Sequence, residues 1–131
     1  MRGEMSNVVL ATQPRDYSAL RYGKITPTDI DGLLDFKNKV WVIFELKHGN
    51  APLPFGQRLA IERLVDDLSS VKPSIGFVAS HNHQSSEDID ASNSIVTSFR
   101  YKNKWVDDTR AMTLRQAIDS FLYKHGISID K

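Results

Sequence analysis

Residues 30–47 read IDGLLDFKNKVWVIFELK and contain the pattern that decides the fold. Apolar residues or glycine occupy the even positions on both sides of a polar tripeptide, and a period of two is typical of strands. These positions are Ile30, Gly32, Leu34 and Phe36, then Val40, Val42, Phe44 and Leu46. The tripeptide Lys37-Asn38-Lys39 has the length of a hairpin loop, and asparagine tolerates the left-handed backbone that such loops require. The stretch predicts one β-hairpin.

The odd positions of this hairpin collect charged side chains on the opposite face. If Phe36 pairs with Val40, then Asp31 faces Glu45 across the strands, and the same register sets Asp29 opposite Lys47. The charged residues that share this face are Asp29, Asp31, Asp35, Glu45 and Lys47.

Two directly opposed carboxylates repel each other unless a cation lies between them or one of them takes up a proton. Ligation by oxygen alone suits Mg²⁺ or Mn²⁺. Lys47 projects on the same face as Glu45, where an ammonium group can orient a water molecule or offset charge on a phosphate. The pattern therefore predicts a divalent-metal site with open positions for a phosphate oxygen and a nucleophilic water.

The remaining elements follow from periodicity and capping signals. Apolar residues at helical spacing predict a helix over 56–70, with Ile61, Leu64, Val65 and Leu68 facing inward. Buried strands are predicted over 74–80 and 95–100, with a short strand around Trp105. Thr113 and Gln116 form a capping box for a last helix that ends at Gly126, and residues 16–22 predict one or two helical turns. We therefore expect one α/β domain over residues 1–131, with four to five strands and flanking helices.

One polar residue lies on the inward face of the first long helix. Gln57 comes one turn before Ile61 and shares its apolar stripe. An amide on a buried stripe needs a hydrogen-bonding partner. Gln57 is therefore a candidate member of the site.

Composition excludes several classes of protein. The 131 residues contain 40% apolar residues, enough for one core, and no cysteine, so disulfides and thiolate metal sites are excluded. The longest apolar stretch, Val40 to Phe44, is far shorter than the roughly 20 residues of a membrane helix, so no membrane partner is expected. The formal charge of +1 is weaker than the basic character of a strong nucleic-acid binder.

The motif Pro27-Thr28-Asp29-Ile30-Asp31-Gly32, followed by Glu45-Leu46-Lys47, resembles the PD-(D/E)XK nuclease superfamily over about residues 26–80. The resemblance implies a restriction-endonuclease-like fold, with a central mixed sheet flanked by helices. It implies that Asp31 and Glu45 bind Mg²⁺, with the Leu46 backbone carbonyl as a third ligand, and that Lys47 is the catalytic lysine. Gln57 matches the glutamine that recombination-type and exonuclease-type branches place on the following helix. Either Asp29 or Asp31 fills the first acidic position, and the pairing favours Asp31.

The resemblance further implies a Mg²⁺-dependent DNA endonuclease, with Mn²⁺ as a substitute, that hydrolyses phosphodiester bonds with a water molecule activated by the metal. A structure-specific enzyme of the resolvase or repair type, in the cytoplasm of a bacterium or a phage-infected cell, would fit. Cleavage of both strands by so small a chain calls for a homodimer. RNA as a substrate stays open. The alternative is a catalytically inactive module of the nuclease fold that binds nucleic acid or a protein partner.

Basic residues recur at the predicted turns, where they form either an ordinary solvated surface or a phosphate track beside aromatic side chains that stack on bases. The basic residues are Arg15, Arg21, Lys24, Lys37, Lys39, Arg100, Lys102 and Lys104, and the aromatic ones are Tyr22, Tyr101 and Trp105. His81 and His83 follow the third strand, either in an exposed loop or near the scissile phosphate.

Overall fold

The computed structural model of the chain describes residues 14–83 and 88–128. Its alternating stretch forms the antiparallel strands β1 (Gly32–Phe36) and β2 (Val40–His48), with Phe36 opposite Val40. The predicted hairpin and its register are therefore confirmed. Lys37 and Asn38 adopt the left-handed conformation, with φ of 56° and 64°. The backbone N–H of Asn38 donates to Oδ1 of Asp35 at 2.7 Å. The polar tripeptide thus closes the hairpin as the sequence predicts.

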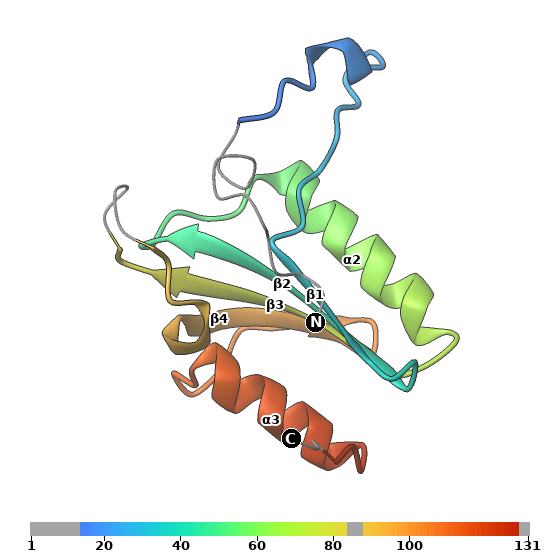
Figure 1. Ribbon diagram of the computed structural model, residues 1–131, viewed down its shortest axis with the longest axis vertical. Coiled ribbons are helices and arrows are strands. Elements are labelled where there is room, and N and C mark those ends of the chain that lie inside the picture. Colours follow the sequence, from blue (N-terminus) through green and yellow to red (C-terminus); the bar gives the residue numbers. More distant parts are fainter. Residues whose placement is uncertain (1–13, 84–87, 129–131) are drawn as a thin grey trace, which may run out of the picture.

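Three further strands and two helices complete a small α/β domain (Figure 1). Along the chain these are α2 (Phe55–Ser69), β3 (Ser74–His81), β4 (Ile95–Tyr101), β5 (Lys104–Val106) and α3 (Leu114–Lys124). Short 3-10 helices form at η1 (Ser18–Leu20) and η2 (Ala91–Asn93). The sheet order is β1-β2-β3-β4-β5, with β2 and β3 parallel and the other neighbours antiparallel. The expected mixed sheet of four to five strands is confirmed with five.

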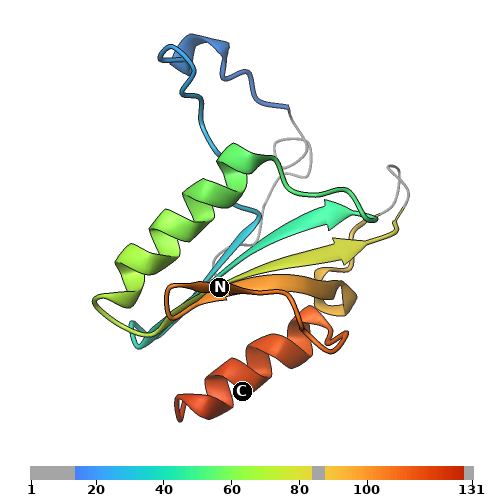
Figure 2. The same cartoon turned by 180° about the vertical axis from the view of Figure 1, so that it is seen from behind.

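The two helices cover opposite faces of the sheet (Figures 1 and 2). Even positions of β2, such as Val42, pack in one core with Phe121 of α3. The odd position Ile43 packs in a second core with Ile61 and Val65 of α2. Because α2 covers the odd face, the acidic and basic end of β2 lies beside this helix and is partly shielded from solvent.

Gly76 brings α2 close to the sheet. A Cβ atom at this position of β3 would lie 2.8 Å from Cγ2 of Val65 and 3.1 Å from Cγ2 of Ile61. Any side chain there would push the helix outward, because real Cβ atoms do not approach so closely. Glycine therefore sets the short distance between α2 and β3.

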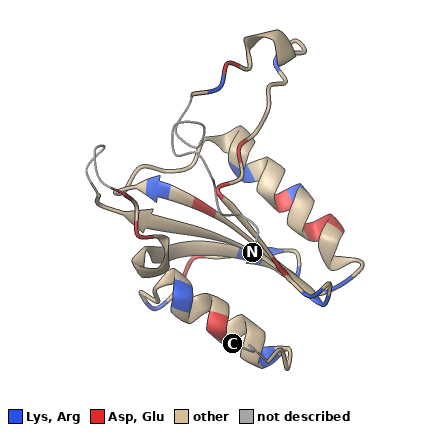
Figure 3. Cartoon of the chain, in the orientation of Figure 1, with Lys and Arg blue, Asp and Glu red and all other residues tan. Residues whose placement is uncertain are grey.

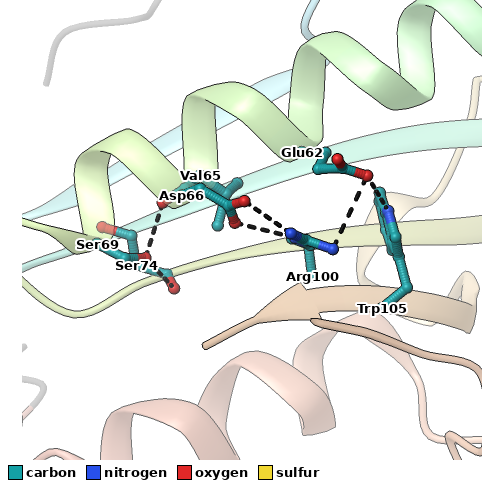
Figure 4. Close-up of polar contacts among 7 residues, drawn as sticks. All are labelled: Glu62, Val65, Asp66, Ser69, Ser74, Arg100 and Trp105. Carbon is teal, nitrogen blue, oxygen red and sulfur yellow. Dashed lines mark hydrogen bonds and ion pairs between the residues drawn. The ribbon is translucent and has the colours of Figure 1, made fainter. Parts of the chain in front are cut away.

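A polar network joins α2 to the far strands of the sheet (Figure 4). Arg100 donates to both carboxylate oxygens of Asp66, at 2.9 and 2.6 Å, and lies 3.8 Å from Glu62. The indole of Trp105 donates to Glu62 at 2.9 Å, and the Arg58 guanidinium covers its ring at 4.0 Å. Arg100 and Trp105 thus fix the helix to β4 and β5, which differs from their expected place in a phosphate track.

The last helix begins as predicted. Thr113 Oγ1 accepts from the Gln116 amide at 3.1 Å, and Gln116 Oε1 accepts from the Thr113 amide at 2.9 Å, so the capping box is confirmed. The segment 14–31 projects beyond the sheet near the start of α2 (Figure 1) and is exposed throughout. Within the described ranges no helix has the length and apolar character needed to cross a membrane; the longer helix, α2, has 15 residues.

Candidate active site

Two carboxylates meet at the open end of the hairpin. The β1–β2 ladder ends with Gly32 opposite Phe44, and one step further the Asp31 amide donates to Oε1 of Glu45 at 3.3 Å. In return the Leu46 amide donates to Oδ2 of Asp31 at 2.7 Å. Each acid thus accepts a hydrogen bond from the backbone of the opposite strand. The structure brings together the two acids that the predicted strand register sets opposite each other.

Glu45 is the buried member of this pair of acids. Its side chain lies on the α2 face of the sheet and is only 5% exposed. Burial raises the pKa of this carboxyl to about 7, and the negative charge of Asp31 adds to the effect. The hydrogen bonds from the Asp31 amide and from Gln57 act in the opposite direction. A buried carboxyl next to a second carboxylate gains from a cation, which would neutralise both groups.

Gln57 connects the first turn of α2 to this pair. Its Nε2 donates to Oε2 of Glu45 at 2.6 Å and to the backbone carbonyl of Asp29 at 3.4 Å. With Oε1 held by the Asp31 amide, both oxygens of Glu45 accept a hydrogen bond. The polar residue on the predicted apolar stripe thus lies at the acids, and it orients Glu45.

Lys47 lies on the same strand face but is turned away from the acids. In Figure 3 a red acidic band and then a blue basic band follow each other toward the carboxyl end of β2. Nζ of Lys47 donates to the Gly49 carbonyl at 3.3 Å, and the Ser80 hydroxyl donates to the same carbonyl at 2.6 Å. Among the described residues, no ion pair within 4 Å joins Lys47 to Glu45 or Asp31.

Sequence reasoning missed Ser80, which pairs with Lys47 in the parallel register of β2 and β3. Only the strand order shows that these residues are neighbours, because 33 positions separate them in the chain. The shared Gly49 carbonyl is thus a local anchor for the lysine.

Asp29 lies apart from the pair, in the exposed segment before β1. Because the ladder ends at Gly32, the strand pairing that would set Asp29 opposite Lys47 is not formed. Asp29 instead contacts Gln57 through its backbone carbonyl.

The atoms that could bind a metal ion at this site are oxygen atoms. The carboxylates of Asp31 and Glu45 are the side-chain ligands. Within residues 14–83 and 88–128, no three His, Asp or Glu side chains form a group able to hold a metal ion. The Leu46 carbonyl can add a third oxygen: in an extended strand the N–H and C=O of one residue point the same way, and the Leu46 N–H points to Asp31. Two carboxylates, a carbonyl and water suit Mg²⁺ or Mn²⁺, which retain several waters.

Three of the four histidines gather at the carboxyl ends of β2 and β3. The ring centroids of His48 and His81 are 5.4 Å apart, and those of His81 and His83 are 5.6 Å apart. His81 pairs with His48 in the register, one position beyond Lys47 and Ser80, so its side chain lies on the opposite sheet face from Lys47. Its position does not support a direct role beside the two acids.

Comparisons with protein-family models, curated proteins and solved structures yield no match. The function is therefore argued from the arrangement of the site.

Proposed function

We propose that this chain is a Mg²⁺-dependent deoxyribonuclease of the PD-(D/E)XK type that hydrolyses phosphodiester bonds. The observation that carries the proposal is the contact between Asp31 and Glu45, with Glu45 buried, its pKa raised to about 7, and its second oxygen held by Gln57. A buried acid with a raised pKa is typical of functional sites, and two opposed carboxylates repel each other unless a cation or a proton lies between them.

Each residue of the site has a distinct task under this proposal. Asp31, Glu45 and the Leu46 carbonyl hold the ion, and Gln57 keeps the Glu45 carboxylate oriented toward it. Bound Mg²⁺, or Mn²⁺ in its place, supplies positive charge that stabilises the phosphate during hydrolysis. Lys47, on its flexible four-carbon stem, leaves the Gly49 carbonyl to hold the attacking water or to offset charge on the phosphate.

The proposed substrate is DNA, and the proposed activity is structure-specific, of the resolvase or repair type, because the described part of the chain carries one pair of opposed acids. A two-fold homodimer would supply the second site that cleavage of both strands requires.

A second function, a nuclease-fold module without turnover, is favoured by one observation. The Lys47 ammonium lies on the Gly49 carbonyl and forms no ion pair with the acids in the described part of the chain. Such a module would bind nucleic acid or a protein partner and keep the acids for a structural ion. Metal binding without hydrolysis would distinguish it from the nuclease.

The test uses isosteric variants, because Glu45→Gln and Asp31→Asn remove charge with little change in shape. Labelled duplex, branched and single-stranded DNA, with RNA in parallel, are incubated with Mg²⁺, with Mn²⁺ or with EDTA. Asp67→Asn, an exposed acid on the outer side of α2, serves as the matched control. Circular dichroism confirms that each variant is folded.

We expect hydrolysis that needs the metal, that is lost in Glu45→Gln, Asp31→Asn and Lys47→Ala, and that persists in Asp67→Asn. Hydrolysis retained in the folded Glu45→Gln and Asp31→Asn variants would refute the proposal. Mn²⁺ binding that depends on Glu45, with no hydrolysis of any substrate, would favour the inactive module.

A further inference from the structure

An open cavity of about 520 Å³ lies between the segment before β1 and residues 56–63 of α2. Its polar lining comes from two separate parts of the chain, with Lys24, Thr26, Thr28 and Asp29 on one side and Gln57 and Arg63 on the other. The volume is within the range of sites that bind ligands.

The cavity adjoins the candidate active site. Gln57 lines the cavity and at the same time donates to Oε2 of Glu45 at 2.6 Å. Asp29 also lines it, and its carbonyl accepts from the same Gln57 amide at 3.4 Å. A molecule in the cavity would therefore lie one side chain away from the buried acid.

Two cations in the lining are available to an anionic ligand. Lys24 and Arg63 are exposed, and within the described residues neither side chain takes part in a hydrogen bond or an ion pair. Arg100 and Arg115, by contrast, are both bonded to carboxylates. The free cations, with the hydroxyl groups of two threonines, form the donor set that proteins use for phosphate oxygens.

Asp29 is the acidic residue of the lining, and it lies at the end next to Gln57. Lys24 and Arg63 line the same cavity, so two cations stand against one carboxylate in the lining. The lining as a whole therefore favours an anion.

We infer that this cavity binds the sugar-phosphate backbone of the substrate DNA strand next to the bond that is cut, with Lys24 and Arg63 contacting phosphates. The inference rests on the proposed function, because the strand is the substrate of the adjoining site. It adds a binding surface for that strand, in which the phosphate contacts come from Lys24 and Arg63, two residues that play no part in holding the ion.

The test measures strand binding without hydrolysis. Fluorescence anisotropy of a labelled single-stranded DNA oligonucleotide is followed in EDTA over a series of salt concentrations. The variant is Lys24→Ala with Arg63→Ala. The control, Arg115→Ala with Lys124→Ala, removes two exposed cations of α3, which covers the other face of the sheet from α2 (Figures 1 and 2). Calorimetric titration with Mn²⁺ is run on all proteins.

Each phosphate contact to a single strand contributes about 0.7 to the slope of log K against log salt, so losing two contacts lowers the slope by about 1.4. We expect the lower slope in the Lys24→Ala, Arg63→Ala protein and not in the control. Its strand binding at low salt should be at least about tenfold weaker than that of the parent protein. Its Mn²⁺ affinity stays unchanged. Equal slopes in variant and control would overturn the inference. It would also be overturned if inorganic phosphate abolished strand binding at concentrations too low to act through ionic strength.

The two proposals fail in different measurements. Strand binding that depends on Lys24 and Arg63, without metal-dependent hydrolysis, refutes the nuclease and leaves the binding surface. Hydrolysis lost in Glu45→Gln, together with strand binding indifferent to Lys24 and Arg63, supports the nuclease and refutes the surface.

Discussion

Nε2 of Gln57 lies 2.6 Å from Oε2 of Glu45, so the first turn of α2 orients a carboxylate carried by β2. Gln57→Leu keeps the size of the side chain and removes this donor. Since partners of a ligand tune its affinity for the ion, we expect Mn²⁺ affinity to fall roughly 10–100-fold, measured by calorimetry. Gln116→Leu is the matched control: it loses the capping box of α3 and should keep its Mn²⁺ affinity. The same affinity in both variants would contradict the role of Gln57.

The raised pKa of Glu45 makes the stability of the metal-free protein depend on pH. The pKa is about 7 in the folded state against an ordinary value of 4.5, so between these values the folded protein binds more protons than the unfolded chain. The free energy of unfolding therefore falls as the pH rises through this range, by up to about 3 kcal/mol. Urea unfolding in EDTA would show the decrease, and Glu45→Gln should remove it. A flat profile in the parent protein would refute the shift.

Gly32 holds the start of β1 under the ring of Phe44. A Cβ atom at position 32 would lie 2.0 Å from Cζ of that ring, so Gly32→Ala must displace the ring or the strand next to Asp31. We expect a loss of about 1–3 kcal/mol in the free energy of unfolding and weaker Mn²⁺ binding. Gly56→Ala, where no atom lies within 4 Å of the added Cβ, should change neither quantity by more than about 1 kcal/mol.

The Arg100–Asp66 pair is expected to stabilise the fold more than the exposed Arg115–Asp119 pair. Side chains of the first pair are 12% and 27% exposed and are bonded through two guanidinium nitrogens, whereas those of the second are 66% and 46% exposed and are bonded through one. Double-mutant cycles by urea unfolding should give a coupling of about 2 kcal/mol for the first pair and below about 0.5 kcal/mol for the second. Equal couplings would contradict the importance of the α2–β4 contact.

Asp29 and Asp31 are predicted to differ in their effect on metal binding. Asp29 reaches Gln57 through its backbone carbonyl, which Asp29→Asn retains, whereas the Asp31 carboxylate lies beside Glu45. Asp31→Asn should abolish Mn²⁺ binding. Asp29→Asn should leave it within about twofold and strengthen the binding of a DNA strand, because a negative charge leaves the cavity. The reverse result would make Asp29 the principal acid.

Local patterns in the sequence were sufficient for most secondary structure. The alternation over 30–46 predicted the hairpin with its register, and Thr113 with Gln116 predicted the start of the last helix. Both depend on contacts between residues close in the chain, which composition and spacing reveal. Gln57 was found because a polar residue broke an apolar stripe. The contact that Arg100 makes was not predicted, because its partner Asp66 lies 34 positions earlier in the chain.

The sequence by itself determined that Asp31 and Glu45 meet, since a hairpin with one short turn allows little choice of register. Tertiary structure alone decided the pairing of β2 with β3, the turn of Lys47 toward Gly49 beside Ser80, and the cavity between segment 24–29 and α2. The reason is physical: these features join segments far apart in the chain, and packing of α2 on the sheet, which also buries Glu45, brings them together.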